Sequence, residues 1–210
     1  MLFLDRKDAA TKLAEQLSRY RGQHPLVLAI PRGAVPMAKI IADALDGEVD
    51  VVLVRKLRAP ANPEFAIGAV DETGWVYLAE YAERIAGSQQ YIESEKATQL
   101  EVMRQRRASY TPVRPPLDPT GRIVIVVDDG LATGSTMIAA LHALRAKHPQ
   151  ILICAVPVAP PDTLAKVTPY ADEVVCLIAP EQFYAVGQFY QSFPQVSDEE
   201  VIALLGKVTG

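Results

Sequence analysis

The residues best suited to chemistry lie between Val126 and Thr136, in the order Val-Val-Asp-Asp-Gly-Leu-Ala-Thr-Gly-Ser-Thr. Two adjacent carboxylates, Asp128 and Asp129, follow an apolar run, and a loop of glycine and hydroxyl residues comes after them. Where such a loop opens a helix, its backbone amides form a site for a phosphate dianion. Carboxylates accept hydrogen bonds from vicinal hydroxyls. The spacing therefore predicts a sugar-phosphate site with the two acids on the sugar.

Two alternative assignments fit this segment less well. A P-loop needs a lysine before its final serine or threonine, where this loop has Gly134, and the sequence contains no G-x-G-x-x-G. Alternatively, Asp128 and Asp129 cap a turn while the hydroxyls cap a helix. Capping accounts for one acid or one hydroxyl, but not for the whole string after a buried strand.

Cationic residues follow two other predicted strands. The run Ile30-Pro-Arg-Gly-Ala34 follows the first strand, so its amides and the Arg32 guanidinium are placed to hold a second anion at the same sheet edge. Arg55 and Lys56 stand where the second strand is expected to end, with Arg58 close behind. A solvated basic face is the alternative for this second group.

Aromatic residues are concentrated after the last predicted strand. Five of the chain's Phe, Tyr and Trp residues fall between Phe183 and Phe193, and the whole sequence has only 5 Phe, 8 Tyr and 1 Trp. Rings such as Phe183 and Tyr184 can stack on a heterocyclic base. The alternative is a loop that covers the edge of the sheet or forms a dimer contact.

The segment from 126 to 136 resembles the phosphoribosyl-pyrophosphate signature of the type I phosphoribosyltransferases, and a looser resemblance covers most of the chain. In that family the two acids bind the ribose 2′- and 3′-hydroxyls, and the loop binds the 5′-phosphate. Carried over by position, the resemblance assigns the ribose to Asp128 and Asp129. It assigns the 5′-phosphate to Ala132, Thr133, Gly134, Ser135 and Thr136.

The same resemblance implies roles for the other motifs. The loop at Arg32 and Gly33 would bind pyrophosphate and contain a non-proline cis peptide at Arg32–Gly33 or a neighbouring bond. Lys56, supported by Arg55, would contact the same pyrophosphate, and the segment with Phe183 and Tyr184 would form part of a hood over the base. Mg²⁺ would be held mainly by the substrate and water, with no direct protein ligand, and a homodimer is the expected assembly.

The resemblance implies transfer of a phosphoribosyl group from 5-phosphoribosyl 1-pyrophosphate to a purine or pyrimidine base, with Asp128, Asp129, Arg32 and Lys56 as catalytic residues. A regulator that binds this substrate or a nucleotide without turnover is the alternative. A sugar-phosphate hydrolase is a third. The sequence does not specify the acceptor base.

These residues require a sheet edge that brings several loops together. Apolar runs predict strands at 26–30, 50–54, 123–127, 151–156 and 173–178, and helical patterns separate most of them. Such alternation predicts an α/β fold with a doubly wound, mostly parallel sheet and ligands at the carboxyl ends of its strands. The 210 residues are expected to form a single domain.

Two segments are expected as additions to that core. Residues 58–120 predict a flexible loop with a short strand at 65–70, a long polar helix from 88 to 109 and a proline-rich connector. Residues 180–210 predict the hood and a C-terminal helix.

Composition narrows the class of protein. Half of the residues are hydrophobic and 22% are charged, which is typical of a globular chain with a core. A net charge of −4 gives no general attraction to nucleic acid or to anionic membranes. The longest apolar run is too short to span a bilayer, and two cysteines cannot form a disulfide framework. These features predict a cytoplasmic protein.

Overall fold

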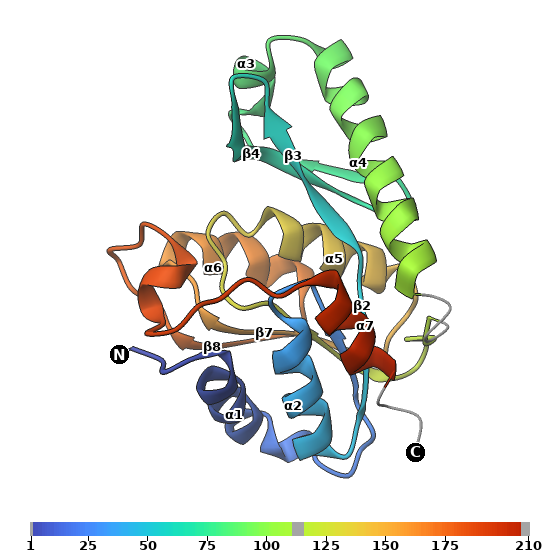
Figure 1. Cartoon of the computed structure of the whole chain (residues 1–210), viewed down its shortest axis with the longest axis vertical. Helices are drawn as coiled ribbons and strands as arrows, with labels where there is room; N and C mark the ends of the chain where they lie inside the picture. Colours follow the sequence, from blue (N-terminus) through green and yellow to red (C-terminus); the bar gives the residue numbers. More distant parts are fainter. Residues whose placement is uncertain (1, 111–115, 207–210) are drawn as a thin grey trace.

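A five-stranded parallel sheet forms the centre of the computed structural model, which describes residues 2–110 and 116–206 (Figure 1). The strands lie in the order β2-β1-β6-β7-β8. Their bounds are β1 Leu26–Ala29, β2 Glu48–Val51, β6 Ile123–Val127, β7 Ile151–Val158 and β8 Glu173–Ile178. All five residues of β6 are buried, because helices cover both faces of the sheet.

The helices divide between the two faces. Helices α1 (Arg6–Gln16) and α2 (Val35–Leu45) cover one face, while α5 (Ser135–Arg145) and α6 (Pro161–Val167) cover the other (Figure 1). Short 3₁₀ helices at Ser18–Tyr20 and Thr168–Tyr170 follow α1 and α6. The predicted doubly wound, mostly parallel α/β fold is confirmed.

The strand order reverses between β1 and β6. These two strands pair in parallel with Ala29 opposite Val127, and the chain leaves them toward α2 and α5 on opposite faces. In open α/β sheets such a reversal leaves a crevice beyond the carboxyl ends of the two strands, where ligands bind. The two loops singled out from the sequence, after Ile30 and after Val127, both begin at this point.

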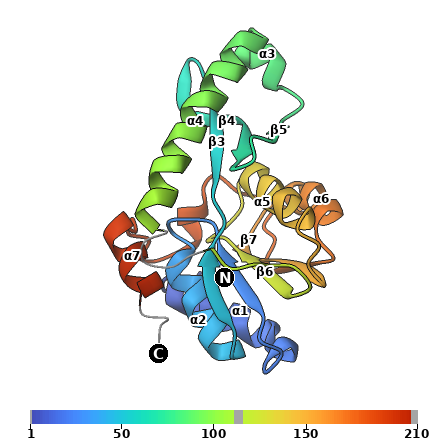
Figure 2. The same cartoon turned by 90° about the vertical axis from the view of Figure 1, so that its right-hand side faces the viewer.

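An arm consisting of residues 54–110 projects from the sheet edge (Figures 1 and 2). A three-stranded antiparallel sheet and two helices form it: β3 Val54–Ala59, β4 Asn62–Asp71, β5 Val76–Leu78, α3 Ala82–Ala86 and α4 Gln89–Tyr110. The base of the arm rests on α5, where the rings of Trp75 and His142 stack with centroids 3.6 Å apart.

The arm corrects two expectations from the sequence. Residues 58–74, expected to be mostly loop, form most of the β3–β4 hairpin, with Ala59 opposite Asn62. Alanine and glycine are frequent in β4 because α5 packs closely against it, and Ala69 is fully buried in the same apolar cluster as α5 residues. The second core strand also ends earlier than predicted, since Val54 belongs to β3 and not to β2.

The start of the described chain lies beside the segment that follows β8. The backbone of Phe3 and Leu4 pairs with residues 189–192, beside a 3₁₀ helix at Val186–Phe189. Helix α7 (Asp198–Gly206) then packs on α2 and α4, and part of the predicted connector, residues 111–115, lies outside the described residues. None of the helices in the described ranges is both long and apolar enough to cross a bilayer.

Candidate functional site

A cavity of about 280 Å³ opens at the carboxyl ends of β1 and β6, where the strand order reverses. Its lining comes from residues 30–33, 54–56, 128–134 and 136, with Val186 from the C-terminal segment. The three motifs that follow predicted strands therefore meet in one cavity, although they lie far apart in the sequence.

Asp128 and Asp129 form one side of the cavity, which we call the carboxylate wall. The Asp129 amide donates to Asp128 Oδ1 at 2.9 Å, and the Tyr190 hydroxyl donates to the Asp129 carbonyl at 2.6 Å. A Cβ placed on Gly33 would lie 2.0 Å from Asp129 Oδ2, so only glycine allows the loop after β1 to approach this carboxylate. Contacts from several segments thus fix the backbone and side chain of Asp129.

The two carboxyl groups differ in their electrostatic surroundings. Burial, followed by the nearby charge of Asp129, raises the pKa of Asp128 well above its usual value. Burial also raises the pKa of Asp129, but the Arg6 guanidinium opposes that shift. Asp128 is therefore the stronger proton acceptor of the pair, while Asp129 retains its charge more readily.

The loop after the carboxylate wall has the form expected of a phosphate site. Gly134 takes a left-handed conformation, with φ +78°, directly before the first turn of α5. Thr133, Gly134 and Thr136 line the cavity together with Ala132, whose carbonyl accepts a 2.6 Å hydrogen bond from the Thr163 hydroxyl. Ser135 is buried and is not among the lining residues; its hydroxyl lies 3.1 Å from that of Thr133.

Arg32, Arg55 and Lys56 form a second side of the cavity, which we call the cationic wall. The peptide bond between Pro31 and Arg32 is cis, a neighbour of the bond expected from the sequence. Arg32 Nη1 lies 3.5 Å from Asp198 Oδ2 of α7, and Lys56 is exposed and makes no ion pair with a described side chain. A small anion can therefore reach both residues.

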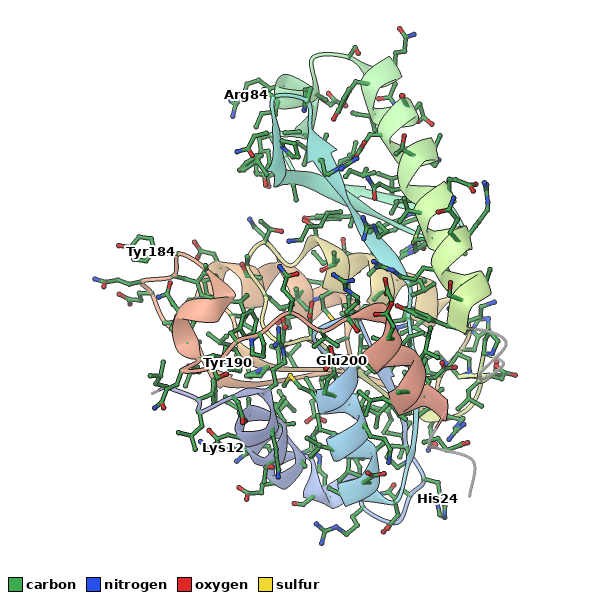
Figure 3. The ribbon with its side chains drawn as sticks, viewed as in Figure 1. Lys12, His24, Arg84, Tyr184, Tyr190 and Glu200 are labelled. Carbon is green, nitrogen blue, oxygen red and sulfur yellow. The ribbon has the colours of Figure 1, made fainter. Side chains whose placement is uncertain are left out.

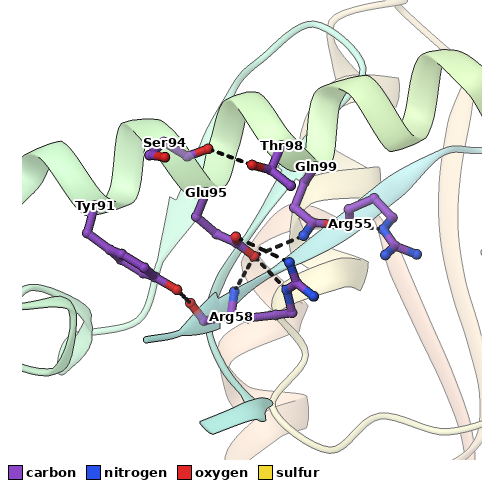
Figure 4. Close-up of polar contacts among 7 residues, drawn as sticks. All are labelled: Arg55, Arg58, Tyr91, Ser94, Glu95, Thr98 and Gln99. Atoms are coloured by element: carbon purple, nitrogen blue, oxygen red, sulfur yellow. Dashed lines mark hydrogen bonds and ion pairs between the residues drawn. The ribbon is translucent and has the colours of Figure 1, made fainter. Parts of the chain in front are cut away.

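Helix α4 supports the cationic wall from behind (Figure 4). Arg55 Nε donates to Gln99 Oε1 at 3.0 Å, and burial, together with the nearby charges of Arg106, Arg58 and Arg32, lowers the pKa of Arg55. Arg58 does not line the cavity; its Nε donates to the buried Glu95 carboxylate at 2.8 Å. Arg55 thus faces the cavity with its positive charge incompletely balanced.

The aromatic segment has two kinds of residue. Phe189 and Tyr190 are buried, and Tyr190 packs against Phe3 and Phe193. Phe183 is half-buried against Phe189, with ring centroids 5.3 Å apart, whereas Tyr184 is 88% exposed and points away from the molecule (Figure 3). Neither of the two proposed base-stacking residues is among those that line the cavity, and Val186 is the part of this segment that does.

Sequence reasoning missed the residues that support Asp129. Arg6 bonds to its carboxylate, Tyr190 bonds to its carbonyl, and Phe193 packs against the Arg6 guanidinium. Arg6 is an ordinary charged residue at the start of a helix, and nothing in the sequence marks it. The aromatic cluster did mark Tyr190 and Phe193, but as candidates for base stacking and not as supports.

The fold and the cavity together define a class of protein: a doubly wound α/β protein with a cavity lined by two carboxylates and three cations where its strand order reverses. Comparison with known proteins narrows this class. The family model described as phosphoribosyl transferase domain matches residues 3–192. The chain belongs to this family, which confirms the resemblance to the type I enzymes.

Individual proteins with similar sequences carry the name of the same family. The chain is 42% identical over 211 residues to a protein named "putative phosphoribosyl transferase" of Mycobacterium tuberculosis strain CDC 1551 / Oshkosh. That match covers 98% of this chain and 47% of the relative, and the same figures hold for its counterpart in strain H37Rv. The chain thus spans about half the length of the curated relatives it matches.

Solved structures support the same fold. The crystal structure of the protein TT1426 from Thermus thermophilus is 47% identical, with a TM-score of 0.83, and each chain is covered in full. A hypoxanthine phosphoribosyltransferase of Staphylococcus aureus has a TM-score of 0.50 at 15% identity, over 86% of this chain and 78% of that one. The second likeness concerns the fold alone.

Proposed function

We propose that the chain transfers the phosphoribosyl group from 5-phosphoribosyl 1-pyrophosphate to a nitrogenous base, giving a nucleoside monophosphate and pyrophosphate. The observation that carries this proposal is a single cavity with walls of opposite charge next to a phosphate loop. The loop at 132–136 suits the 5′-phosphate, the carboxylate wall suits the ribose hydroxyls, and the cationic wall suits the pyrophosphate.

The reaction replaces one bond at the anomeric carbon with another. The C1–O bond breaks with its electron pair leaving on pyrophosphate, and a ring nitrogen of the base forms the new C1–N bond from the opposite face. Arg32, Arg55 and Lys56 stabilise the negative charge that grows on the leaving group. Asp128 and Asp129 stabilise the positive charge on the ribose, and Asp128 accepts the proton that the base loses, since its pKa is raised.

Mg²⁺ enters this scheme as part of the substrate. The two aspartates are the only acidic residues among the described residues that line the cavity, and the described part of the chain holds no group of three or more His, Cys, Asp or Glu side chains suited to a metal. Such a site fits an ion that the pyrophosphate oxygens and water carry in, as Mg²⁺ commonly binds in phosphate sites. Its charge would add to that of the cationic wall.

The acceptor and the assembly belong to the same proposal. The acceptor is a purine or pyrimidine that enters beside Val186, the residue of the aromatic segment that lines the cavity. The active form is a cytoplasmic homodimer, and neither nucleic acid nor membrane takes part in the reaction.

The decisive experiment measures pyrophosphate release that depends on an added base. The protein would be incubated with 5-phosphoribosyl 1-pyrophosphate, Mg²⁺ and a panel of purines, pyrimidines and related heterocycles. Release with one base supports transfer, whereas release without any base indicates a hydrolase. Thermal stabilisation by the substrate with no turnover indicates a regulator that only binds it.

Paired substitutions then connect the reaction to the carboxylate wall. Asp128→Asn with Asp129→Asn should reduce transfer at least about a thousandfold, because both the ribose contacts and the proton acceptor are lost. The control is Asp43→Asn with Asp46→Asn, which removes the same charge from two positions on and after α2, away from the cavity. Unchanged turnover in the first double variant, with both proteins folded by circular dichroism, would contradict the proposal.

A further inference from the structure

Arg6 makes an unusual set of contacts for a residue outside the predicted site. Its Nε and Nη2 atoms donate to the same oxygen, Asp129 Oδ2, at 3.0 and 2.8 Å. Its Nη1 atom donates to the Pro194 carbonyl at 2.5 Å, and the guanidinium lies 3.8 Å from the centre of the Phe193 ring. The side chain is only 11% exposed, so these contacts fix the guanidinium in one orientation.

Two segments hold Arg6 in place: the start of the chain, and residues 189–194. Arg6 is the first residue of α1, whose N-cap Asp5 accepts a hydrogen bond from the Asp8 amide at 2.8 Å. Just before it, the Phe3 amide donates to the Phe189 carbonyl, and the Gln191 amide donates to the Phe3 carbonyl, both at 2.8 Å. The backbone on both sides of the guanidinium is therefore fixed before any ligand arrives.

Two other residues, Gly33 and Tyr190, also limit the movement of Asp129. Gly33 leaves no room for further atoms beside Oδ2, and the Tyr190 hydroxyl holds the backbone carbonyl. Asp129 nevertheless lines the cavity. With Oδ2 occupied by Arg6 and packed against Gly33, Oδ1 is the oxygen available to a ligand.

We propose that Arg6 is a positioning residue that holds Asp129 by Oδ2 and thereby presents Oδ1, charged and in a fixed direction, to a hydroxyl of the bound sugar phosphate. This inference rests on the proposed function, because it assumes that a sugar occupies the cavity. It adds to that function a residue of α1 that acts on the substrate only through Asp129.

Charge supports the geometry. Burial disfavours the ionised form of Asp129 and raises its pKa. The cations that oppose this effect are Arg6 on α1 and Lys56 on β3, and the Tyr190 hydroxyl also lies close by. Among these groups Arg6 alone bonds directly to the Asp129 carboxylate, so its removal would alter both the charge and the direction of that side chain.

A purely structural role is the alternative, since the same side chain ties α1 to the segment that contains Phe193 and Pro194. Removing one partner of a largely buried ion pair leaves the other charge uncompensated, so a lower melting temperature alone would not distinguish the two roles. Arg6→Met keeps an unbranched side chain over the Phe193 ring but loses the bonds to Asp129. The two roles therefore differ in what this variant does to ligand binding at a temperature where both proteins are folded: a positioning role predicts weaker binding, and a purely structural role predicts a lower melting temperature only.

The test measures the affinity for ribose 5-phosphate by calorimetry in the wild type and three variants. Arg6→Met should bind about 10- to 100-fold more weakly, because a misplaced contact group loses that much in oriented sites. Arg6→Lys, which keeps the charge but cannot make both bonds to Oδ2, should fall between it and the wild type. Lys7→Ala removes an exposed charge from the next position and should bind like the wild type.

A double-mutant cycle asks whether Arg6 acts through Asp129. In an Asp129→Asn background, Arg6→Met should cause little further loss of affinity, because the contact it maintains is already gone. An equal loss in both backgrounds would overturn the inference, as would wild-type affinity in Arg6→Met. In turnover assays the loss should appear in the KM for 5-phosphoribosyl 1-pyrophosphate and in kcat, but not in the KM for the base.

Failure of the proposed function is recognised separately. If the wild type binds ribose 5-phosphate but transfers nothing to any base, the transfer reaction is wrong and the role of Arg6 stands. If the wild type binds no sugar phosphate, crystal structures of the wild type and of Arg6→Met decide the matter. A carboxylate of Asp129 that keeps its direction without Arg6 would refute the positioning role, and one that turns away would support it.

Discussion

The carboxylate wall and the cationic wall face the same cavity but are supported in different ways. Asp129 receives bonds from Arg6 and Tyr190 at distances of 2.6 to 3.0 Å, and Gly33 packs against it. Arg32, by contrast, is 36% exposed, and its contact with Asp198 is 3.5 Å long. The wall assigned to the ribose is thus fixed in advance. In the wall assigned to pyrophosphate, Arg55 is held by Gln99, but Arg32 and Lys56 are solvated and can adjust.

This difference agrees with the chemistry expected of each wall. Ribose hydroxyls need acceptors in a fixed direction while the anomeric carbon reacts, and fixed groups require no reorganisation in the transition state. Pyrophosphate enters or leaves with its metal ion, so its contacts must form and break in every turnover. Rigid acceptors and adjustable cations therefore suit the two halves of one substrate.

The largest effect that would test this comparison is expected from Lys56→Ala. Loss of one charged hydrogen-bond donor should weaken pyrophosphate binding about 10- to 100-fold. Binding of ribose 5-phosphate should change little, because the carboxylate wall and the phosphate loop are untouched. Calorimetry with both ligands makes the comparison.

Arg84→Ala, at the far end of the arm (Figure 3), is the matched control for this substitution and should change neither affinity. If Lys56→Ala lowered the affinity for both ligands equally, the two walls could not be treated as separate sites.

A smaller effect, in the opposite direction, is expected from Asp198→Asn. The Asp198 carboxylate lies 3.5 Å from both Arg32 and Arg106, and it also accepts a 2.8 Å hydrogen bond from the Tyr110 hydroxyl. Asparagine can keep the bond to Tyr110 but no longer neutralises the arginines. Pyrophosphate should then bind roughly two- to fivefold more tightly, as expected when a partly exposed ion pair is lost.

Glu72→Gln, which frees Arg107 outside the cavity, is the control for charge and should leave pyrophosphate affinity unchanged. Weaker binding in Asp198→Asn would mean that Asp198 orients Arg32 for the ligand and does not compete with it.

The smallest effect concerns thermal stability, which the buried carboxyl group of Asp128 is expected to lower. Because the pKa of Asp128 is raised in the folded protein, the folded protein keeps a proton that the unfolded chain releases. The free energy of unfolding therefore falls as the pH rises from the unfolded pKa to the folded pKa. Asp128→Asn should remove that cost and raise the Tm at about pH 7 by a few degrees. The gain should disappear near pH ~4 and below, where the unfolded carboxyl is itself protonated at about its reference pKa.

Thermal unfolding followed across pH provides the measurement, and Asp43→Asn, an exposed substitution on α2, should show no such trend. A Tm gain that is independent of pH would mean that packing, and not ionisation, separates Asp128 from asparagine.

Sequence-based prediction worked best for site residues that lie next to a predicted strand in the sequence. The loops with Arg32 and Asp128 directly follow buried strands, and parallel strands bring such loops to one edge, so these two residues could be placed together from their positions. Lys56 was also expected there, although it lies on β3, which follows β2. The arm was predicted less well, because alanine and glycine in β4 were taken as signs of a loop. Their small size instead lets α5 pack against the strand.

The support of the carboxylate wall could not be predicted. Arg6 and Asp129 are 123 residues apart, and Tyr190 lies 61 residues beyond Asp129. No periodicity or spacing relates side chains at such separations, since only the completed fold brings them into contact. A motif therefore identifies the residues that meet a ligand, but not those that hold them.

The bond between Arg6 and the carbonyl of Pro194 also bears on synthesis. The ribosome makes Arg6 188 residues before Pro194, so this contact can form only after almost the whole described chain has been synthesised. Contacts of such long range form late in folding, after the local helices and strands. A sugar phosphate that binds there would favour molecules in which this segment is already in place, and its supply would act as a folding aid by mass action.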